Sequence, residues 1–209
     1  MIEAMDENVG RLLDTLDDLQ LEERTVVVFT SDNGGLSTLR GTNAPTSNLP
    51  LRAGKGWCYE GGIRVPLIIR AAAVARPGSV CHVPVISTDF YPTILALAGL
   101  PLNPEQHQDG LSLVPLLQGG DSLPRDALFW HYPHYHGSMW KPGAAIRAGD
   151  WKLIEFYEEG RTELYQLSDD MGETTDLAGT HPEKTRQLQE QLRAWQQRVG
   201  AQMPIRQAP

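Results

Sequence analysis

The sequence has only two cysteines, Cys58 and Cys81, among 209 residues. Two thiols so far apart are too few for a disulfide framework or a zinc knuckle, and they leave the redox compartment open. The chain also lacks a run of about 18 apolar residues, which a membrane helix needs, so no membrane partner is expected. Its first residues are acidic and amphipathic, unlike a signal peptide, and the sequence leaves the compartment unknown.

Basic residues are scarce as well. Lys and Arg total 18 against 26 Asp and Glu, which gives a formal net charge of -8 and a pI near 5.2. Because phosphate binding needs a basic patch, we expect no nucleic-acid partner. The composition is otherwise typical of a globular protein with a buried core, with 41% hydrophobic and 21% charged residues.

Hydrophobic periodicity predicts an α/β arrangement in the first half of the chain. Apolar residues at steps of three and four over Ile2–Leu19 predict an amphipathic helix. The runs Thr25–Thr30 and Val65–Arg70 predict strands that are buried on both faces. Residues 36–62, which contain many glycines and two prolines, predict a long irregular loop. Residues 88–97 predict a short helix.

The pattern changes towards the end of the chain. The segment Ala127–Tyr132 predicts a further strand. Short antiparallel strands separated by turn residues are predicted at 145–147, 151–157 and 163–166. Pro182, followed by apolar residues at helical spacing, predicts a terminal helix. We therefore predict an α/β domain at 1–143 and a small antiparallel domain at 144–209.

Asp32 and Asn33 directly follow the first predicted strand, within the sequence SDNGG. In open α/β sheets ligands collect beyond the carboxyl ends of strands. A carboxylate and an amide oxygen are hard ligands of the kind that calcium or magnesium prefers. The same residues are also ordinary turn chemistry, and two oxygens are too few for a complete metal site.

Lys55 lies between two glycines, which would let the backbone approach a ligand while the ammonium reaches an anionic oxygen. The alternative is a solvated lysine with no ligand. Arg52 is open to the same two interpretations. Arg64 is expected to pair with Glu60 and brace the loop.

Three histidines, separated by aromatic residues and a proline, gather in the segment 131–136. Imidazoles can donate protons or contact a polar substrate, and the aromatic residues suit a sugar or aryl face. A structural role for at least one histidine is the alternative, because their spacing matches no standard zinc motif. The candidates for substrate contacts are His134, His136 and Trp140.

A nucleophile is hard to find. Hydroxyl groups lie near the predicted site at Ser31, Ser37, Thr46 and Ser47, but no Gly-x-Ser-x-Gly elbow exposes one of them. Cys58 is a candidate thiol, although nothing in the sequence around it indicates activation.

Three blocks of the sequence, TVVVFTSDNGG, LRAGKGWCYEGGIRVPLIIR and STDFYPTILALAG, occur in the order that resembles the type I sulfatase family. This family is arylsulfatase-like and belongs to the alkaline phosphatase superfamily. The resemblance extends to about Ala178 and is most specific at Gly54–Pro66. It implies the later part of an alkaline-phosphatase-like α/β sandwich, with a small C-terminal antiparallel sheet and a terminal helix.

The resemblance also implies a chemistry, the hydrolysis of sulfuric esters in a sulfated carbohydrate or an aryl sulfate. Asp32 and Asn33 would be two ligands of a calcium or magnesium ion. Lys55 would contact the sulfate or the leaving-group oxygen. Many members of the family are exported.

The nucleophile of the family has no counterpart in this sequence. It is a formylglycine, made within a C-x-P-x-R or C-x-A-x-R motif. Around Cys81 the proline comes one place late and the arginine is missing, and Cys58 does not match at all. We therefore expect the later part of a sulfatase, inactive alone and binding calcium weakly. It would expose a sheet edge that self-associates unless the missing N-terminal segment is supplied.

Two alternatives remain open. Phosphodiesterases and phosphonate hydrolases share this superfamily and a similar metal site. The other alternative is a non-catalytic glycan-binding module that uses the aromatic and histidine residues of 130–140.

Overall fold

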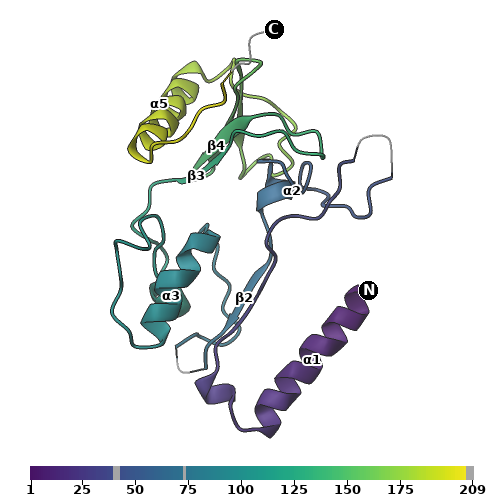
Figure 1. Cartoon of the computed structure of the whole chain (residues 1–209), viewed down its shortest axis with the longest axis vertical. Coiled ribbons are helices and arrows are strands. Elements are labelled where there is room, and N and C mark those ends of the chain that lie inside the picture. The colour runs from purple at the N-terminus through teal and green to yellow at the C-terminus, as the bar shows by residue number, and fades with distance from the viewer. Residues whose placement is uncertain (40–42, 73, 206–209) are drawn as a thin grey trace. The chain divides into compact units, whose positions relative to one another are not determined.

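The computed structural model in Figure 1 describes residues 1–39, 43–72 and 74–205. The chain forms two compact units, Met1–Thr30 with Leu67–Pro124, and Ser31–Pro66 with Arg125–Pro209. Residues 40–42 of the predicted irregular loop lie outside the described residues. The domain boundary at residue 143 stays a prediction.

The first unit combines helices with a two-stranded sheet. Its elements are α1 (Ile2–Asp18), the 3-10 turn η1 (Glu22–Arg24), β1 (Val27–Thr30), β2 (Leu67–Arg70), the 3-10 turn η2 (Ser87–Asp89), α3 (Phe90–Leu97) and α4 (Val114–Leu117). The two predicted strands and the two predicted helices of this region are confirmed. β1 and β2 pair antiparallel, with Val28 opposite Ile69.

The prediction that both strands are buried on both faces is wrong for the described chain. Val28 is 40% exposed and Ile68 63% exposed. The cause lies in the sheet itself, because β1 and β2 pair only with each other and no further described strand extends them. Each strand therefore has one unpaired edge, the feature that promotes pairing with other chains.

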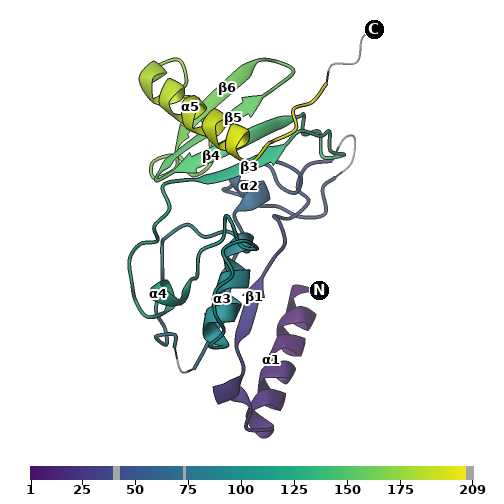
Figure 2. The same cartoon turned by 60° about the vertical axis from the view of Figure 1, so that its left-hand side comes forward.

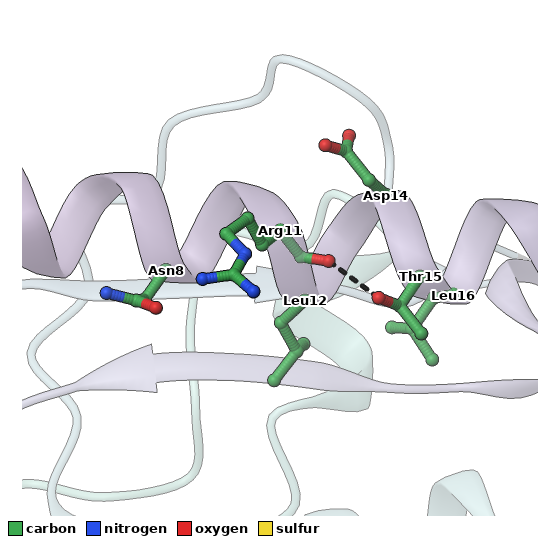
Figure 3. Close-up of a pocket in the computed structure, with 6 residues that line it drawn as sticks. All are labelled: Asn8, Arg11, Leu12, Asp14, Thr15 and Leu16. Carbon is green, nitrogen blue, oxygen red and sulfur yellow. Dashed lines mark hydrogen bonds between the residues drawn. The ribbon is translucent and has the colours of Figure 1, made fainter.

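Helix α1 leaves its apolar stripe exposed. Ile2, Met5, Leu12 and Leu19 are between 49% and 79% exposed. An ion pair connects the helix to β2, where Arg70 Nη2 lies 3.1 Å from Asp17 Oδ1. The shallow hollow in Figure 3 is lined by residues of α1 alone, so it follows one side of an exposed helix and contains none of the predicted site residues.

The second unit is built on a four-stranded antiparallel sheet in the order β3-β4-β5-β6. The strands are β3 (Leu128–Tyr132), β4 (Gly143–Ala148), β5 (Trp151–Phe156) and β6 (Arg161–Gln166), and the helices are α2 (Glu60–Ile63) and α5 (Pro182–Arg198). The four predicted strands and the terminal helix are confirmed. The short helix α2 was not predicted, because its Gly61-Gly62 pair is a poor helix former.

The two faces of this sheet are covered by different layers. One face is covered by α5, as Figure 2 shows, and this helix packs through Leu188 and Leu192. The other face is covered by the glycine-rich loop, through Cys58, Tyr59 and Trp57. The core residues under the loop are Trp140, Ala145, Ile154, Phe156, Tyr165 and Leu167. The loop that carries Lys55 is thus a layer of the core, which fixes its backbone.

None of the helices within the described ranges is both long and apolar enough to cross a bilayer.

Candidate functional site

Asp32 and Asn33 lie where β1 has ended and the chain enters the second unit. The Asn33 side-chain amide donates a hydrogen bond to the Asp32 carboxylate. The Ser31 hydroxyl donates to the Asn33 carbonyl oxygen at 2.8 Å. Asp32 is exposed and Asn33 partly exposed, so both side chains can be reached from solvent.

These two residues fit part of a calcium or magnesium site. The donor set is one carboxylate and the amide oxygen of Asn33, whose NH₂ group is the part that bonds to Asp32. Over residues 1–39, 43–72 and 74–205, no group of three or more His, Cys, Asp or Glu side chains converges to hold a metal ion. Asp32 and Asn33 would therefore need ligands from elsewhere to enclose an ion.

Backbone hydrogen bonds connect the Asp32 segment to the Lys55 loop. Lys55 N–H donates to the Gly35 carbonyl oxygen at 3.0 Å, and Gly34 N–H donates to the Gly62 carbonyl oxygen at 3.0 Å. A Cβ atom on Gly34 would overlap the carbonyl oxygen of Gly61, so the two segments approach more closely than a side chain allows. The side chain of Lys55 is exposed. The predicted metal ligands and Lys55 therefore belong to one local arrangement.

Asn48 strengthens this connection, and the sequence alone did not single it out. Its Nδ2 donates to Gly35 O at 2.8 Å, to Ala53 O at 2.9 Å and to Ser37 Oγ at 3.1 Å. Its Oδ1 accepts from Gly35 N–H at 3.1 Å. One amide side chain thus holds the segment after Asp32 against the segment before Lys55.

His136 is half-buried beside the Lys55 loop. A Cβ atom on Gly56 would overlap the His136 imidazole, which means that the ring lies directly on the Gly56 backbone. Trp57 reaches the same turn, because its Nε1–H donates to Ser138 O at 2.8 Å. The structure therefore places His136 against the residue that follows Lys55, although 81 positions separate Lys55 and His136 in the sequence.

The other aromatic and histidine candidates have different surroundings. His134 is exposed and its ring packs at 5.6 Å from the ring of Tyr132. Trp140 is 1% exposed and its indole N–H donates to Tyr132 O at 3.1 Å. An indole so deeply buried supports the turn rather than offering a face to a ligand, whereas His134 is accessible.

His131 has a structural position, as expected for at least one histidine of this segment. Its Nδ1 lies 2.7 Å from the Tyr157 hydroxyl, and its Nε2 lies 3.0 Å from the Gln202 carbonyl oxygen. Gln196 Nε2 donates to the same Tyr157 hydroxyl at 2.8 Å. Both ring nitrogens of His131 are therefore occupied by partners within the fold.

A buried network of charges anchors the loop to the sheet. Lys152 Nζ lies 2.9 Å from Glu60 Oε1 and 2.8 Å from Glu173 Oε1, and all three side chains are at most 1% exposed. Glu173 Oε2 accepts from Glu60 N–H at 2.7 Å. Burial raises the pKa of the Glu173 carboxyl, and the Lys152 charge opposes that rise.

Two arginines complete the outer side of this network. Arg64 Nη1 lies 3.6 Å from Glu60 Oε2, which confirms the predicted pair, and Arg147 Nη1 lies 3.5 Å from the same oxygen. Glu60 is therefore surrounded by three cationic groups. Breaking a buried ion pair by removing one partner is strongly destabilising, so this network fixes where the loop can lie.

Arg52 makes structural contacts, although its side chain is 39% exposed. Its Nη1 donates to the Tyr165 hydroxyl at 2.7 Å and to the Glu173 carbonyl oxygen at 2.8 Å. Its guanidinium also lies 4.0 Å from the centroid of the Tyr59 ring. These contacts engage Arg52 with the core, whereas the side chain of Lys55 is exposed.

Neither cysteine has the features of an activated nucleophile. Cys58 is buried, and burial raises the pKa of its thiol to about 12. Cys81 is exposed and lies in the first unit. The Ser37 hydroxyl donates to Ala53 O at 2.6 Å and accepts from Asn48, so it is part of the loop's hydrogen bonding.

Two family models match the chain and overlap in its middle. The model described as "Sulfatase" matches residues 1–100, and the model described as "N-sulphoglucosamine sulphohydrolase, C-terminal" matches residues 53–200. Together they extend over the predicted metal ligands, Lys55 and the histidine segment.

Curated relatives agree with these matches. A "Sulfatase" of Formosa agariphila is 39% identical over 217 residues, which cover 93% of this chain and 38% of the relative. "Arylsulfatase A" of Homo sapiens is 38% identical over 197 residues, which cover 84% of this chain and 38% of the relative. The chain thus spans less than two fifths of the length of either protein.

Solved structures share the fold. A protein solved in complex with its substrate D-glucosamine-2-N,6-O-disulfate superposes with a TM-score of 0.78 and 30% identity, over 94% of this chain and 39% of that one. The phosphonate monoester hydrolase of Agrobacterium radiobacter gives a TM-score of 0.70 and 27% identity, over 95% and 40%. These likenesses confirm the predicted fold, the later part of an alkaline-phosphatase-like α/β sandwich.

Proposed function

Because the chain belongs to the sulfatase family, we propose that it forms the later part of a sulfuric ester hydrolase and contributes one portion of its active site. The observation that carries this proposal is the hydrogen bond from Lys55 N–H to Gly35 O, which joins the predicted cation to the segment of the predicted metal ligands. The formylglycine nucleophile would come from a segment outside residues 1–209.

In this proposal each residue has a defined task. The ammonium of Lys55 contacts an oxygen of the sulfate group or of the leaving group and offsets the negative charge that develops there. The oxygens of Asp32 and Asn33 hold part of a calcium or magnesium site. A divalent ion bound there would polarise the sulfate oxygens as a Lewis acid. Asn48 and the buried charges keep these groups in place.

We propose a sulfated carbohydrate as the substrate, with an aryl sulfate as the simpler model compound. Support comes from the protein solved with D-glucosamine-2-N,6-O-disulfate, and from a second relative by structure that was solved with a neocarrahexaose. His134 and His136 are the proposed sugar or sulfate contacts of this chain. Trp140 is buried beneath them and would support the turn that presents His136.

Two assays test this proposal. The purified chain, given calcium and 4-nitrophenyl sulfate, should release no nitrophenol, because no nucleophile of the family type is present. Turnover by this chain alone would contradict that expectation. The reading frame that encodes the chain, expressed with its in-frame upstream sequence, should contain a C-x-P-x-R or C-x-A-x-R segment and should hydrolyse the same compound.

A phosphonate hydrolase is the second candidate function, because the chain resembles the phosphonate monoester hydrolase of Agrobacterium radiobacter in structure. The extended protein should therefore be assayed with 4-nitrophenyl sulfate and 4-nitrophenyl phenylphosphonate side by side. A higher kcat/KM for the phosphonate would replace the sulfatase proposal with this one.

A glycan-binding module is the remaining alternative. It would use the exposed rings of His134 and Tyr135 without any chemistry. Binding of a sulfated disaccharide that persists in Asp32→Ala and after metal chelation would favour the module. Loss of binding in Lys55→Met would favour the proposed hydrolase site.

A further inference from the structure

The hydrogen bonds around His136 fix which ring nitrogen carries the proton in the neutral imidazole. The backbone N–H of Ser138 donates to His136 Nδ1 at 3.2 Å, and the Ser138 hydroxyl lies 2.8 Å from the same nitrogen. A backbone N–H can only donate, so Nδ1 must accept. The neutral ring therefore carries its proton on Nε2, where it is a hydrogen-bond donor.

The groups that hold this tautomer are buried or hydrogen-bonded within the fold. Ser138 is fully buried, and its carbonyl oxygen accepts from Trp57 Nε1 at 2.8 Å. His136 N–H donates to Trp140 O at 3.2 Å, so the turn is closed by its own backbone. Each of these contacts orders the ring before any ligand arrives, which is the condition under which a donor stabilises an anion most effectively.

The remaining nitrogen of His136 is unoccupied. In the described part of the chain, Nε2 of His136 has no hydrogen-bond partner, in contrast to His131, where both nitrogens are engaged. The ring is half-buried and lies on the backbone of Gly56, the residue that follows Lys55, whose side chain is exposed. The proposed neutral donor thus lies against the loop that carries the ammonium of Lys55.

We propose that His136 Nε2–H and Lys55 Nζ bind two oxygens of the same tetrahedral oxyanion, the sulfate group of the substrate. The proposal rests on the function proposed above and adds to it a second, neutral donor with a fixed tautomer. Ser138 is a positioning residue, because it acts on the sulfate only through His136. Gly56 is required at its position because any Cβ there would displace the ring.

The tautomer itself is the first test. In the chain labelled with ¹⁵N-histidine, two-bond ¹H–¹⁵N correlation spectra should show His136 with the proton on Nε2 and Nδ1 as an acceptor. A His136 ring protonated on Nδ1 in its neutral form would overturn the proposal, because the donor would then point at Ser138.

Inorganic sulfate is the probe for the site. Titration to about 100 mM, against sodium chloride at matched ionic strength, should shift the His136 Nε2 and Lys55 side-chain signals with one common dissociation constant. His131 should not respond. A sulfate response at Lys55 without one at His136 would overturn this inference and leave the proposed function supported. No response at either residue would count against both.

Two glycines provide a matched pair of variants. Gly56→Ala places a Cβ where the His136 ring lies, at a residue with φ +84, whereas a Cβ on Gly137 would meet nothing within 4 Å. Gly56→Ala should weaken sulfate binding about tenfold or more, the loss expected for one hydrogen bond to a charged group. Gly137→Ala should bind sulfate like the unmodified chain. His136→Ala should lower the affinity seen at Lys55 to the same extent, and equal affinity in all three variants would contradict the proposal.

Discussion

The side chain of Asn48 brackets the backbone of Gly35. Its Oδ1 accepts from Gly35 N–H at 3.1 Å, and its Nδ2 donates to Gly35 O at 2.8 Å. Gly35 O also accepts from Lys55 N–H at 3.0 Å. Asn48 and Gly35 are 13 positions apart in the sequence. Their contact holds the segment of the predicted metal ligands beside the segment of the predicted sulfate contact.

Asn48→Asp should weaken the hydrogen bonds that hold Gly35, with little change in side-chain volume. The substitution removes three donated hydrogen bonds and points a carboxylate at two carbonyl oxygens. Because an unmade hydrogen bond of this kind costs about 1–3 kcal/mol, the amide proton of Lys55 should exchange at least about tenfold faster. Amide hydrogen exchange measured by NMR checks this. The matched control is Asn8→Asp on the exposed helix α1, and equal exchange in both variants would contradict the role of Asn48.

Lys152→Met should destabilise the second unit by about 3 kcal/mol or more. Removal of the ammonium leaves the buried carboxylates of Glu60 and Glu173 without their shared cation. Tryptophan fluorescence during urea unfolding measures this unit selectively, because all five tryptophans lie in it. Arg186→Met, on the exposed surface of α5, should change stability by less than about 0.5 kcal/mol. If the two variants unfold alike, the network does not anchor the loop.

The two cysteines should differ sharply in reactivity. Burial raises the pKa of the Cys58 thiol to about 12, whereas Cys81 is exposed. At pH 8 iodoacetamide should therefore modify Cys81 in the native protein, and Cys58 only after denaturation. Mass spectrometry of tryptic peptides separates the two sites. Fast native labelling of Cys58 would contradict its assignment to the core.

Asp170 should contribute to acid sensitivity. Desolvation alone would raise the pKa of its carboxyl, but hydrogen bonds from the Thr174 and Thr175 backbone and the Thr174 hydroxyl outweigh it and lower that pKa. A lowered folded-state pKa gives stability that is present above the unfolded value, about 3.9, and lost as the pH falls through the folded value. Asp170→Asn should flatten the fall in stability below about pH 4. If urea titrations show the same fall in unfolding free energy below about pH 4 for Asp170→Asn and for the unmodified chain, this prediction is wrong.

The helices and strands could be predicted because each is encoded over a short stretch, whereas the roles of the site residues stay a prediction. Strand and helix periods span fewer than 20 residues, and Asp32, Asn33 and Lys55 fall in blocks that resemble a known family. The network of Lys152 with Glu60 could not be predicted in this way. Its members are 92 positions apart, and a charged residue in a strand pattern normally indicates a solvent-facing position.

Two features of the aromatic and strand segments show why burial is harder to predict than element type. Trp140 follows a polar turn and was a candidate for substrate contact, yet the loop containing Trp57 covers it, at 5.6 Å between ring centroids. Val28 and Ile68 have the composition of a doubly buried strand pair but remain exposed. In both cases the burial of the side chain depends on a layer formed by residues far away in the sequence. Such a layer covers Trp140, and among the described residues none covers Val28 or Ile68.

The central claim, that Lys55 lies in the active site of a sulfatase, is tested most directly by one comparison. The protein expressed from the reading frame with its upstream sequence is assayed for hydrolysis of 4-methylumbelliferyl sulfate as wild type, as Lys55→Met and as the surface control Lys141→Met. Removal of one group that stabilises transition-state charge costs about 100-fold to 1000-fold in kcat. We predict a loss of that size for Lys55→Met and wild-type activity for Lys141→Met, and full activity in Lys55→Met would contradict the account.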